Sequence, residues 1–186
     1  LRTYSFNSFL SIANNLKLNI NQVQFPSRYG GNIRVFMSKR KKIINVKVKK
    51  KLLLKEKNFS KEFLKINSHI KKWKNKKKKL ILDLNKKHGP LPAKAFPGRA
   101  AIILKLLGLN KQNISAIYEK PGSKKIGFYA PGTKIKILNE NNLKNYNKNI
   151  PIINLAWHIS KEIKKYLIKK EIKNKIINIV ENKDFI

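Results

Sequence analysis

The sequence has no cysteine and few acidic residues, and each shortage excludes a class of function. Without cysteine the chain has no disulfide, no thiolate zinc site and no cysteine nucleophile. The nine acidic residues are spread over 186 positions without a close pair suited to acid–base catalysis. The three histidines, His69, His88 and His158, do not cluster with carboxylates. The sequence therefore predicts no metal site and no catalytic residue.

Long apolar runs and a signal pattern are also missing. No run approaches the roughly 20 residues that a bilayer-spanning helix needs, and no charged segment followed by an apolar one opens the chain. We therefore expect a cytoplasmic protein with no membrane partner. The chain begins with leucine, not methionine, which we interpret as a cut edge within a longer protein.

Positive charge is the most prominent feature of the composition. A net charge of +35 is typical of proteins that bind nucleic acid or another polyanion. However, arginine, which supplies bidentate and stacking contacts to nucleic acids, makes up only five of the 44 basic residues. Lysine, asparagine and isoleucine, which all have A/T-rich codons, together supply 88 of the 186 residues. We keep a non-catalytic basic module as the alternative function, although the dispersed lysines argue against nucleic acid as the partner.

The first 78 residues predict two regions. In region 1–38, apolar spacing predicts a helix over 4–15, and alternation predicts an antiparallel pair of strands over 18–25 and 32–38, with Tyr29-Gly30-Gly31 at a turn. In region 39–78, the lysine runs predict a solvated connector over 39–57. A helix from Ser60 to about Lys77 follows, because Ser60 is a good cap and precedes an apolar stripe.

The third region, 79–186, alternates strands with helices. Strands are expected at 80–84, 114–118, 134–138, 150–157 and 175–180, and helices at 99–107, 140–144 and 158–170. Gly108 is placed to end the first of these helices. Such alternation implies parallel crossovers. The sequence therefore predicts an α/β, Rossmann-like, doubly wound, mostly parallel sheet, preceded by a short helix and a β-hairpin.

A glycine- and proline-rich loop at 85–97 is the most ligand-like segment. It follows a predicted strand and leads to a helix N-terminus, where doubly wound folds bind anions. Lys94 and Arg99 add positive charge. The glycine spacing fits neither a dinucleotide fingerprint nor a P-loop, so an anion or nucleotide contact and a purely structural loop both remain open.

Several ordered motifs resemble one family, the S-adenosylmethionine-dependent sugar C-methyltransferases that act on nucleotide-linked hexoses. The motif from Gly127 to Ile135 is similar to the family's Pro-Gly-Thr segment. Ala156-Trp157-His158, followed by Glu162-Ile163, is similar to its Trp-Asn segment, and Gly89 to Lys94 to its Gly-Ala loop. Leu1 to Phe6 and Tyr29 to Val35 resemble the junction that follows the methyl-transfer domain.

The resemblance implies the C-terminal part of such an enzyme. In that family a base removes a proton beside the sugar carbonyl and the resulting carbon nucleophile takes the methyl group of S-adenosylmethionine. The catalytic cluster and the cofactor site lie upstream, outside this chain, so the chain alone is expected to be inactive. Its expected partners are the upstream methyltransferase domain, in cis or as a separate chain, and the nucleotide-sugar substrate. The candidate substrate-binding residues are Tyr4, His88, Gly89, Lys94, Arg99, Trp157 and His158.

Overall fold

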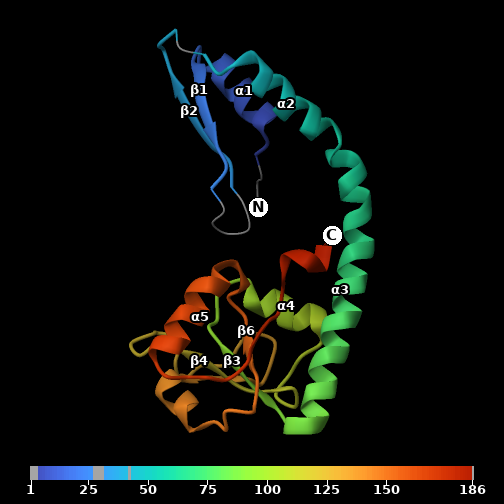
Figure 1. Ribbon diagram of the computed structural model, residues 1–186, viewed down its shortest axis with the longest axis vertical. Coiled ribbons are helices and arrows are strands. Elements are labelled where there is room, and N and C mark those ends of the chain that lie inside the picture. Colours follow the sequence, from blue (N-terminus) through green and yellow to red (C-terminus); the bar gives the residue numbers. More distant parts are fainter. Residues whose placement is uncertain (1–3, 27–31, 42, 186) are drawn as a thin grey trace. The chain divides into compact units, whose positions relative to one another are not determined.

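A computed structural model describes residues 4–26, 32–41 and 43–185. Contacts within the chain form two compact units, residues 1–67 and 68–186. The long helix α3 (Phe59–His88) contributes residues to both units (Figure 1). Within the described ranges, no helix is both long and apolar enough to cross a membrane.

The N-terminal unit confirms the predicted helix and strand pair. Its elements are α1 (Phe6–Asn15), β1 (Asn19–Gln24), β2 (Arg34–Ser38) and α2 (Val46–Lys57). The two strands pair antiparallel, and a small core gathers Phe6, Ala13, Ile20 and Ile44. The predicted turn at 29–31 and the first three residues lie outside the described residues.

The connector predicted over 39–57 is wrong for most of its length, because residues 46–57 form helix α2. Asn45 caps this helix by accepting a hydrogen bond from the backbone N–H of Lys47 at 2.8 Å. Leu52 and Leu53 pack on the core of the N-terminal unit. Lysine is itself a good helix former, so a lysine run interrupted by leucines forms a helix wherever tertiary contacts cover the leucines.

Glu56 of α2 caps the start of α1, which gives a testable prediction for the N-terminal unit. Its carboxylate accepts hydrogen bonds from the backbone N–H groups of Phe6 and Asn7. The Glu56→Gln variant keeps an acceptor but loses the charge that interacts with the helix dipole, whereas Glu56→Ala removes both. We expect the alanine variant to lose about 1–2 kcal/mol and the glutamine variant less than half of that. Amide hydrogen exchange of α1 measures this, and equal effects would contradict the capping role.

The C-terminal unit contains a five-stranded parallel sheet with strand order β5-β4-β3-β6-β7. This order confirms the predicted α/β, Rossmann-like fold, since crossovers run outward on both sides of the central strands. The strands are β3 (Leu91–Lys94), β4 (Ile114–Glu119), β5 (Lys136–Asn139), β6 (Ile152–Asn154) and β7 (Ile176–Asn178). The helices after α3 are α4 (Ala100–Leu107), η2 (Glu140–Asn145), η3 (Trp157–Ile159), α5 (Ser160–Lys169) and η4 (Asn182–Phe185).

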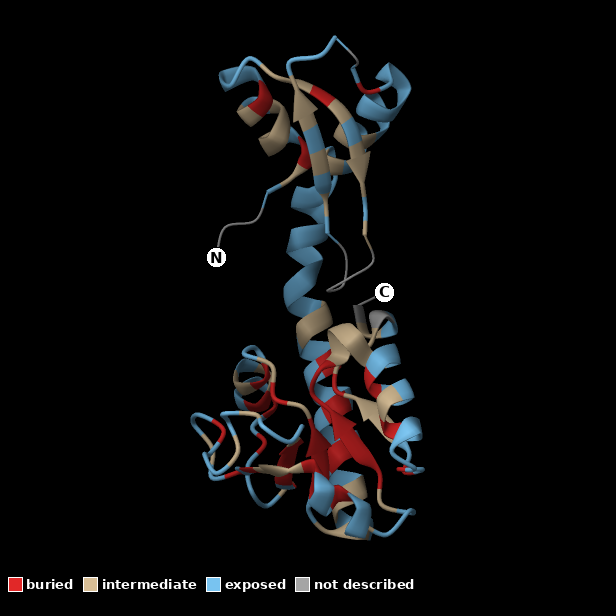
Figure 2. Cartoon of the chain, turned by 90° about the vertical axis from the view of Figure 1, so that its left-hand side faces the viewer, coloured by how far each residue is buried: buried red, intermediate tan, exposed pale blue. Residues whose placement is uncertain are grey.

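Helices cover both faces of this sheet, whose central strands are buried (Figure 2). One core cluster joins Trp73 and Ile81 of α3 and Leu104 of α4 to the strands. A second cluster, on strand residues of the other face, includes Ile163 of α5 and Leu143 of η2. Gly108 ends α4 in the left-handed conformation at φ 65°, as its position predicts.

The strand predicted at 80–84 is wrong, because these residues are the last part of α3. Trp73, Lys77 and Ile81 are buried at intervals of four residues, whereas Leu80 and Leu82 on either side of Ile81 are each 39% exposed. A spacing of four places side chains on one face of a helix. The short apolar run is therefore a helix stripe with two exposed neighbours.

The loop predicted over 85–97 contains the central strand β3, all four residues of which are buried. The presence of Pro92 argued against a strand here, because proline lacks the N–H group that a residue of a central strand donates. The structure accommodates it by an irregularity: the register with β4 shifts between Leu91 and Ala93. The backbone N–H groups of Leu91 and Ala95, on either side, still donate to carbonyls of Asn113 and Tyr118.

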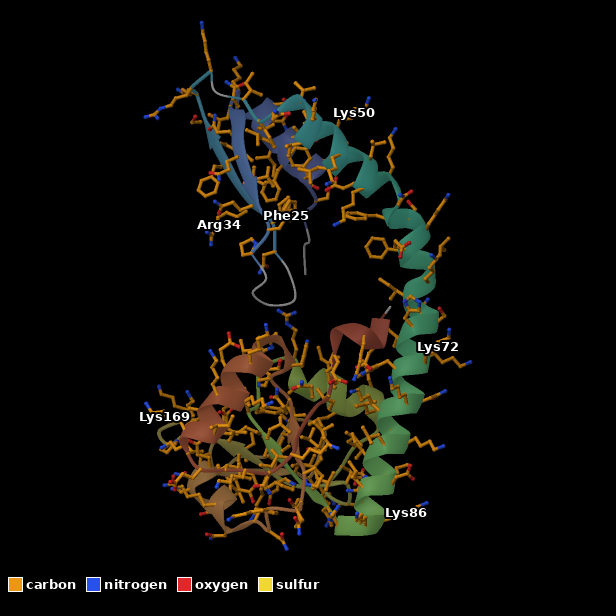
Figure 3. The ribbon with its side chains drawn as sticks, viewed as in Figure 1. Phe25, Arg34, Lys50, Lys72, Lys86 and Lys169 are labelled. Carbon is orange, nitrogen blue, oxygen red and sulfur yellow. The ribbon has the colours of Figure 1, made fainter. Side chains whose placement is uncertain are left out.

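Lysine side chains project from several elements and do not gather on one. Lys50 of α2, Lys72 and Lys86 of α3, and Lys169 of α5 are examples (Figure 3). All four are exposed. This distribution agrees with the dispersed pattern of the sequence.

Candidate functional site

The carboxyl ends of β3 and β6 form the place where a doubly wound sheet binds ligands. From β3 the chain crosses by α4 to β4, and from β6 it crosses by α5 to β7 on the other side. Ligands in such folds bind where the strand order reverses. We define the switch-point site as the segments that follow β3 and β6, Ala95–Arg99 and Leu155–His158, together with Glu119, the last residue of β4.

Lys94, the last residue of β3, is buried beneath this site. Its side chain is 1% exposed, and its ammonium group is bonded to the carboxylate of Glu140 and to the carbonyl oxygen of Tyr118 at 3.3 Å. The hydroxyl of Tyr166 donates to the other oxygen of Glu140. The ammonium of Lys94 is therefore engaged inside the protein and does not face solvent.

Electrostatics explain how this buried network remains charged. Burial by itself raises the pKa of Glu140, but hydrogen bonds from Lys94 and Tyr166 outweigh it and lower the pKa below its usual value. Burial, followed by the hydrogen bond to Glu140, raises the pKa of Tyr166 to about 12. The carboxylate thus stays ionised and the phenol stays protonated at neutral pH. Lys120 adds a cation 4.4 Å from the centre of the Tyr166 ring.

Glu119 and Lys125 hold the loop that follows β3. The Glu119 carboxylate accepts from the backbone N–H of Phe96 at 2.7 Å, and the Lys125 ammonium donates to the carbonyl of Phe96 at 2.6 Å. Ala95 adopts a left-handed φ of 65°, which non-glycine residues rarely do. The loop conformation is therefore enforced by its neighbours. Glu119 also ends the second strand of the βαβ unit, where related folds place the acidic residue that binds a ribose.

Arg99, Trp157 and His158 all belong to the switch-point site, and Arg99 is near enough to act electrostatically on His158. Burial, followed by the charge of Arg99, lowers the pKa of His158, and the charge of Glu162 opposes this shift. His158 is therefore predominantly neutral at pH 7. The Trp157 and His158 rings lie edge to face, with centroids 5.6 Å apart. Arg99 is exposed and immediately precedes α4.

Two further predicted site residues lie at the opposite end of β3. His88 and Gly89 precede β3, so the strand separates them from the loop at its carboxyl end. Gly89 has a φ of 71°, and its carbonyl accepts from the side chain of Asn85 at 3.0 Å, which gives it a structural role in the turn. Tyr4 belongs to the N-terminal unit, and the centroid of its ring lies 5.9 Å from that of the Phe9 ring.

Sequence reasoning missed Glu119, Glu140 and Tyr166. A usable signal existed for Glu119, because it follows the β3–α4 loop by about the 20 residues that separate the glycine loop from the acidic residue in Rossmann units. Glu140 and Tyr166 had no such signal. They are 46 and 72 positions from Lys94 in the numbering, and only the packing of η2 and α5 against the sheet brings them together.

The loop after β3 differs from the glycine-rich turn of nucleotide-binding folds. A glycine-rich loop lets the backbone approach a bound nucleotide, whereas here the loop carries Phe96, whose side chain is buried, followed by Pro97. Among the described residues, no group of three histidine or acidic side chains is arranged to hold a metal ion. The residues present at the switch-point site offer a cation, a carboxylate and an aromatic surface.

Comparison with known proteins agrees with this architecture. A search of curated proteins found no match. A family model described as "C-methyltransferase C-terminal domain" matches residues 27–179. This match spans most of the chain and includes all five strands of the parallel sheet. The chain therefore belongs to the family of C-methyltransferase C-terminal domains.

Proposed function

We propose that the C-terminal unit binds the nucleotide part of a nucleotide-linked sugar and so helps to complete the substrate pocket of an S-adenosylmethionine-dependent C-methyltransferase. The observation that carries the proposal is that Arg99, His158 and Trp157 all belong to the site where the strand order reverses, with Glu119 at the end of the next strand. The upstream methyltransferase domain holds the methyl donor and the catalytic base.

Each residue has a distinct part in binding. The exposed guanidinium of Arg99 pairs with the diphosphate, for which arginine offers two parallel donors. Glu119 keeps one carboxylate oxygen on the loop N–H of Phe96 and uses the other to accept from a ribose hydroxyl. Neutral His158 forms a hydrogen bond to the nucleotide without adding a positive charge. Lys94 does not touch the substrate. Its ion pair with Glu140 instead holds the carboxyl end of β3 in place.

The contribution of these residues to catalysis is positional. Binding the nucleotide at the rigid carboxyl ends of the strands limits where the sugar carbon can lie. Such orientation of two reactants lowers the barrier of a bimolecular step. The chain's own residues bind and orient, and no proton transfer is assigned to them.

Arg99 provides the direct test. In calorimetric titrations of the 186-residue chain with thymidine or uridine diphosphate, we expect Arg99→Ala to weaken binding at least tenfold, because one charge-assisted bidentate contact is worth about 1.5–3 kcal/mol. Lys111→Ala, an exposed change in the loop between α4 and β4, is the matched control and should change affinity less than twofold. Equal affinities for the two variants would contradict the proposed site.

The placement of the methyl donor is tested separately. S-adenosylmethionine should give no saturable heat with the same chain, because our proposal assigns the donor site to the upstream domain. Saturable binding of the donor to this chain would contradict our assignment of the donor to the upstream domain, whatever the result with nucleotides.

A further inference from the structure

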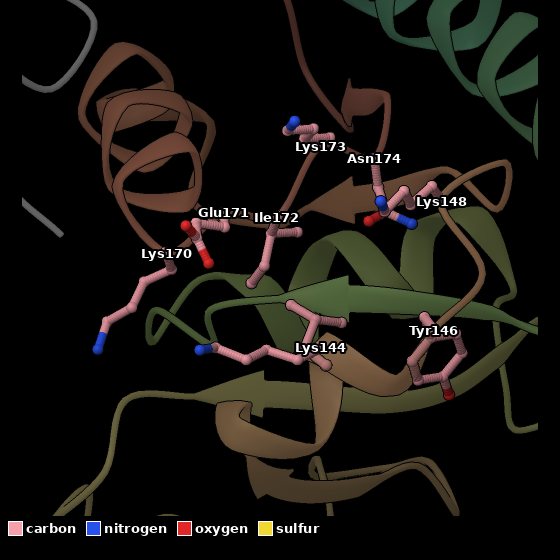
Figure 4. Close-up of a pocket in the computed structure, with 9 residues that line it drawn as sticks. Lys144, Tyr146, Lys148, Lys170, Glu171, Ile172, Lys173 and Asn174 are labelled. Atoms are coloured by element: carbon pink, nitrogen blue, oxygen red, sulfur yellow. The ribbon is translucent and has the colours of Figure 1, made fainter.

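A hollow rich in lysine lies away from the switch-point site. It has a volume of about 420 Å³ and is formed by the segments 143–148 and 170–174 (Figure 4). These segments lead into the amino ends of β6 and β7, and none of the switch-point residues lines it. We name it the lysine pocket. Four of its nine lining residues are lysines: Lys144, Lys148, Lys170 and Lys173.

The charges of these four lysines are largely uncompensated, although that of Lys170 also helps to lower the pKa of Glu140, which does not line the pocket. Among the described residues, no carboxylate oxygen lies within 4 Å of any of the four ammonium groups. Glu171 is the single acidic residue in the lining. The C-terminus of α5 adds a partial negative charge of roughly half a unit. The pocket therefore retains an excess of about two to three positive charges, which matches a dianion or trianion.

Hydrogen bonds fix the two walls relative to each other. The buried side chain of Asn174 donates to the carbonyls of Asn147 and Ile150, each at 2.8 Å, so the segment before β7 is tied to the segment before β6. Tyr146 shares a hydrogen bond with Tyr118 at 3.0 Å, which anchors the same wall to the sheet. The pocket is thus formed without a ligand, and a preformed site loses less entropy on binding.

Lysines on both walls can reach one bound molecule. Figure 4 shows Lys144 from one segment and Lys170 from the other extending toward the same side of the pocket. Leu143 and Ile172, both buried, form an apolar floor below the charged rim. A shallow hollow with a fixed floor and a cationic rim suits a compact phosphorylated molecule better than an extended strand of nucleic acid.

We propose that the lysine pocket is a second anion site, which binds a small molecule bearing two or three phosphate charges independently of the switch-point site. An adjoining hollow carries Lys161, Lys164, Lys173 and Lys175, so charge in this part of the protein is not confined to one place. Asn174 lines both hollows, but only in the lysine pocket do its hydrogen bonds tie one wall to the other. The proposal therefore predicts dependence on particular lysines, not on total charge.

Inorganic pyrophosphate is the probe, measured by calorimetry with the 186-residue chain in 150 mM salt, where unspecific lysine contacts are screened. We expect saturable binding that the Lys144→Gln, Lys148→Gln, Lys170→Gln and Lys173→Gln quadruple variant weakens at least tenfold. The matched control replaces Lys161, Lys164, Lys169 and Lys175, which are also exposed, by glutamine and so has the same net charge. Its affinity should fall less than threefold.

Three results with pyrophosphate would overturn the proposal: no saturable binding, an equal loss in the two quadruple variants, or a loss caused by Arg99→Ala alone. The last would place the probe at the switch-point site. Tighter binding of a random DNA oligonucleotide than of pyrophosphate, lost in the first variant, would also overturn it in favour of a nucleic-acid surface.

A measurement on the unmodified protein covers the case in which a variant fails to fold. Pyrophosphate should protect Lys144 and Lys170 from acetylation, read by mass spectrometry, at least threefold more than it protects Lys72 and Lys86 of α3. Uniform protection of all four lysines would count against the pocket.

Discussion

Replacing Lys94 by methionine is expected to destabilise the C-terminal unit by about 3–5 kcal/mol, because it leaves the carboxylate of Glu140 buried without its cation. Lys94 and Glu140 are 1% and 4% exposed, so water cannot compensate for the missing partner. Both tryptophans of the chain, Trp73 and Trp157, belong to this unit. Urea unfolding followed by tryptophan fluorescence therefore reports on this unit selectively.

The double variant, Lys94→Met with Glu140→Leu, is the matched control. A buried ion pair replaced by apolar groups of similar volume often costs little, so we expect the double variant to recover at least half of the loss. Tyr166 then loses its acceptor, which sets a limit to the recovery. A single variant that loses less than 1 kcal/mol, or a double variant no more stable than the single one, would refute the account.

The pH dependence of this network has a definite sign. The pKa of Glu140 is lower in the folded protein than its ordinary value of about 4.3. Its contribution to the free energy of unfolding is therefore complete above that ordinary value and disappears as the pH falls through the lower, folded pKa. The stability difference between the natural protein and Glu140→Gln should accordingly be large at pH 7 and shrink in acid.

Replacing Trp73 by alanine is expected to destabilise the C-terminal unit by about 3–5 kcal/mol, since a large buried aromatic side chain leaves a cavity. Trp73 lies on α3, is 2% exposed, and its indole N–H donates to the carbonyl of Ile179 at 3.0 Å. The side chain therefore fills the core and also secures the segment after β7. Circular dichroism during urea unfolding measures the effect in this variant.

The matched variant Trp73→Phe separates the two contributions. Phenylalanine keeps most of the apolar volume but leaves the carbonyl of Ile179 without its donor, so we expect a loss of about 1–3 kcal/mol. Lys77, one turn later on α3, still donates to the carbonyl of Asn178 at 2.9 Å and pairs with Glu181 at 3.1 Å. A phenylalanine variant as unstable as the alanine variant would show that the hydrogen bond, not the volume, is decisive.

The fold class could be predicted because the spacing of apolar residues and the residues that end helices are local signals. Alternating strands and helices after residue 100 indicated parallel crossovers, and Gly108 marked the end of α4 where the chain needs a positive φ. The errors were local as well. At 80–84 a short apolar run fits a buried strand or a helix stripe equally well, and at Pro92 the rule against central prolines concealed β3.

The candidate site was only partly predictable. Arg99 was named as a candidate because it adds charge to a loop before a helix, and Trp157 and His158 because they resemble the family's Trp-Asn segment. Lys94 was identified too, but its burial against Glu140 gives it a supporting part in our proposal. Glu140 and Tyr166 could not be predicted, because their approach to Lys94 depends on how η2 and α5 pack on the sheet.

The sequence by itself determined the α/β alternation, the absence of cysteine chemistry and the family motifs, since each resides in neighbouring residues. The tertiary structure decided which charges are buried and which are free. Lysines are alike in sequence, yet Lys77 and Lys94 are enclosed with carboxylates while Lys144 and Lys170 remain at the rim of an open pocket. A charge takes its energetic meaning from the partners and solvent around it, and those depend on contacts between distant segments.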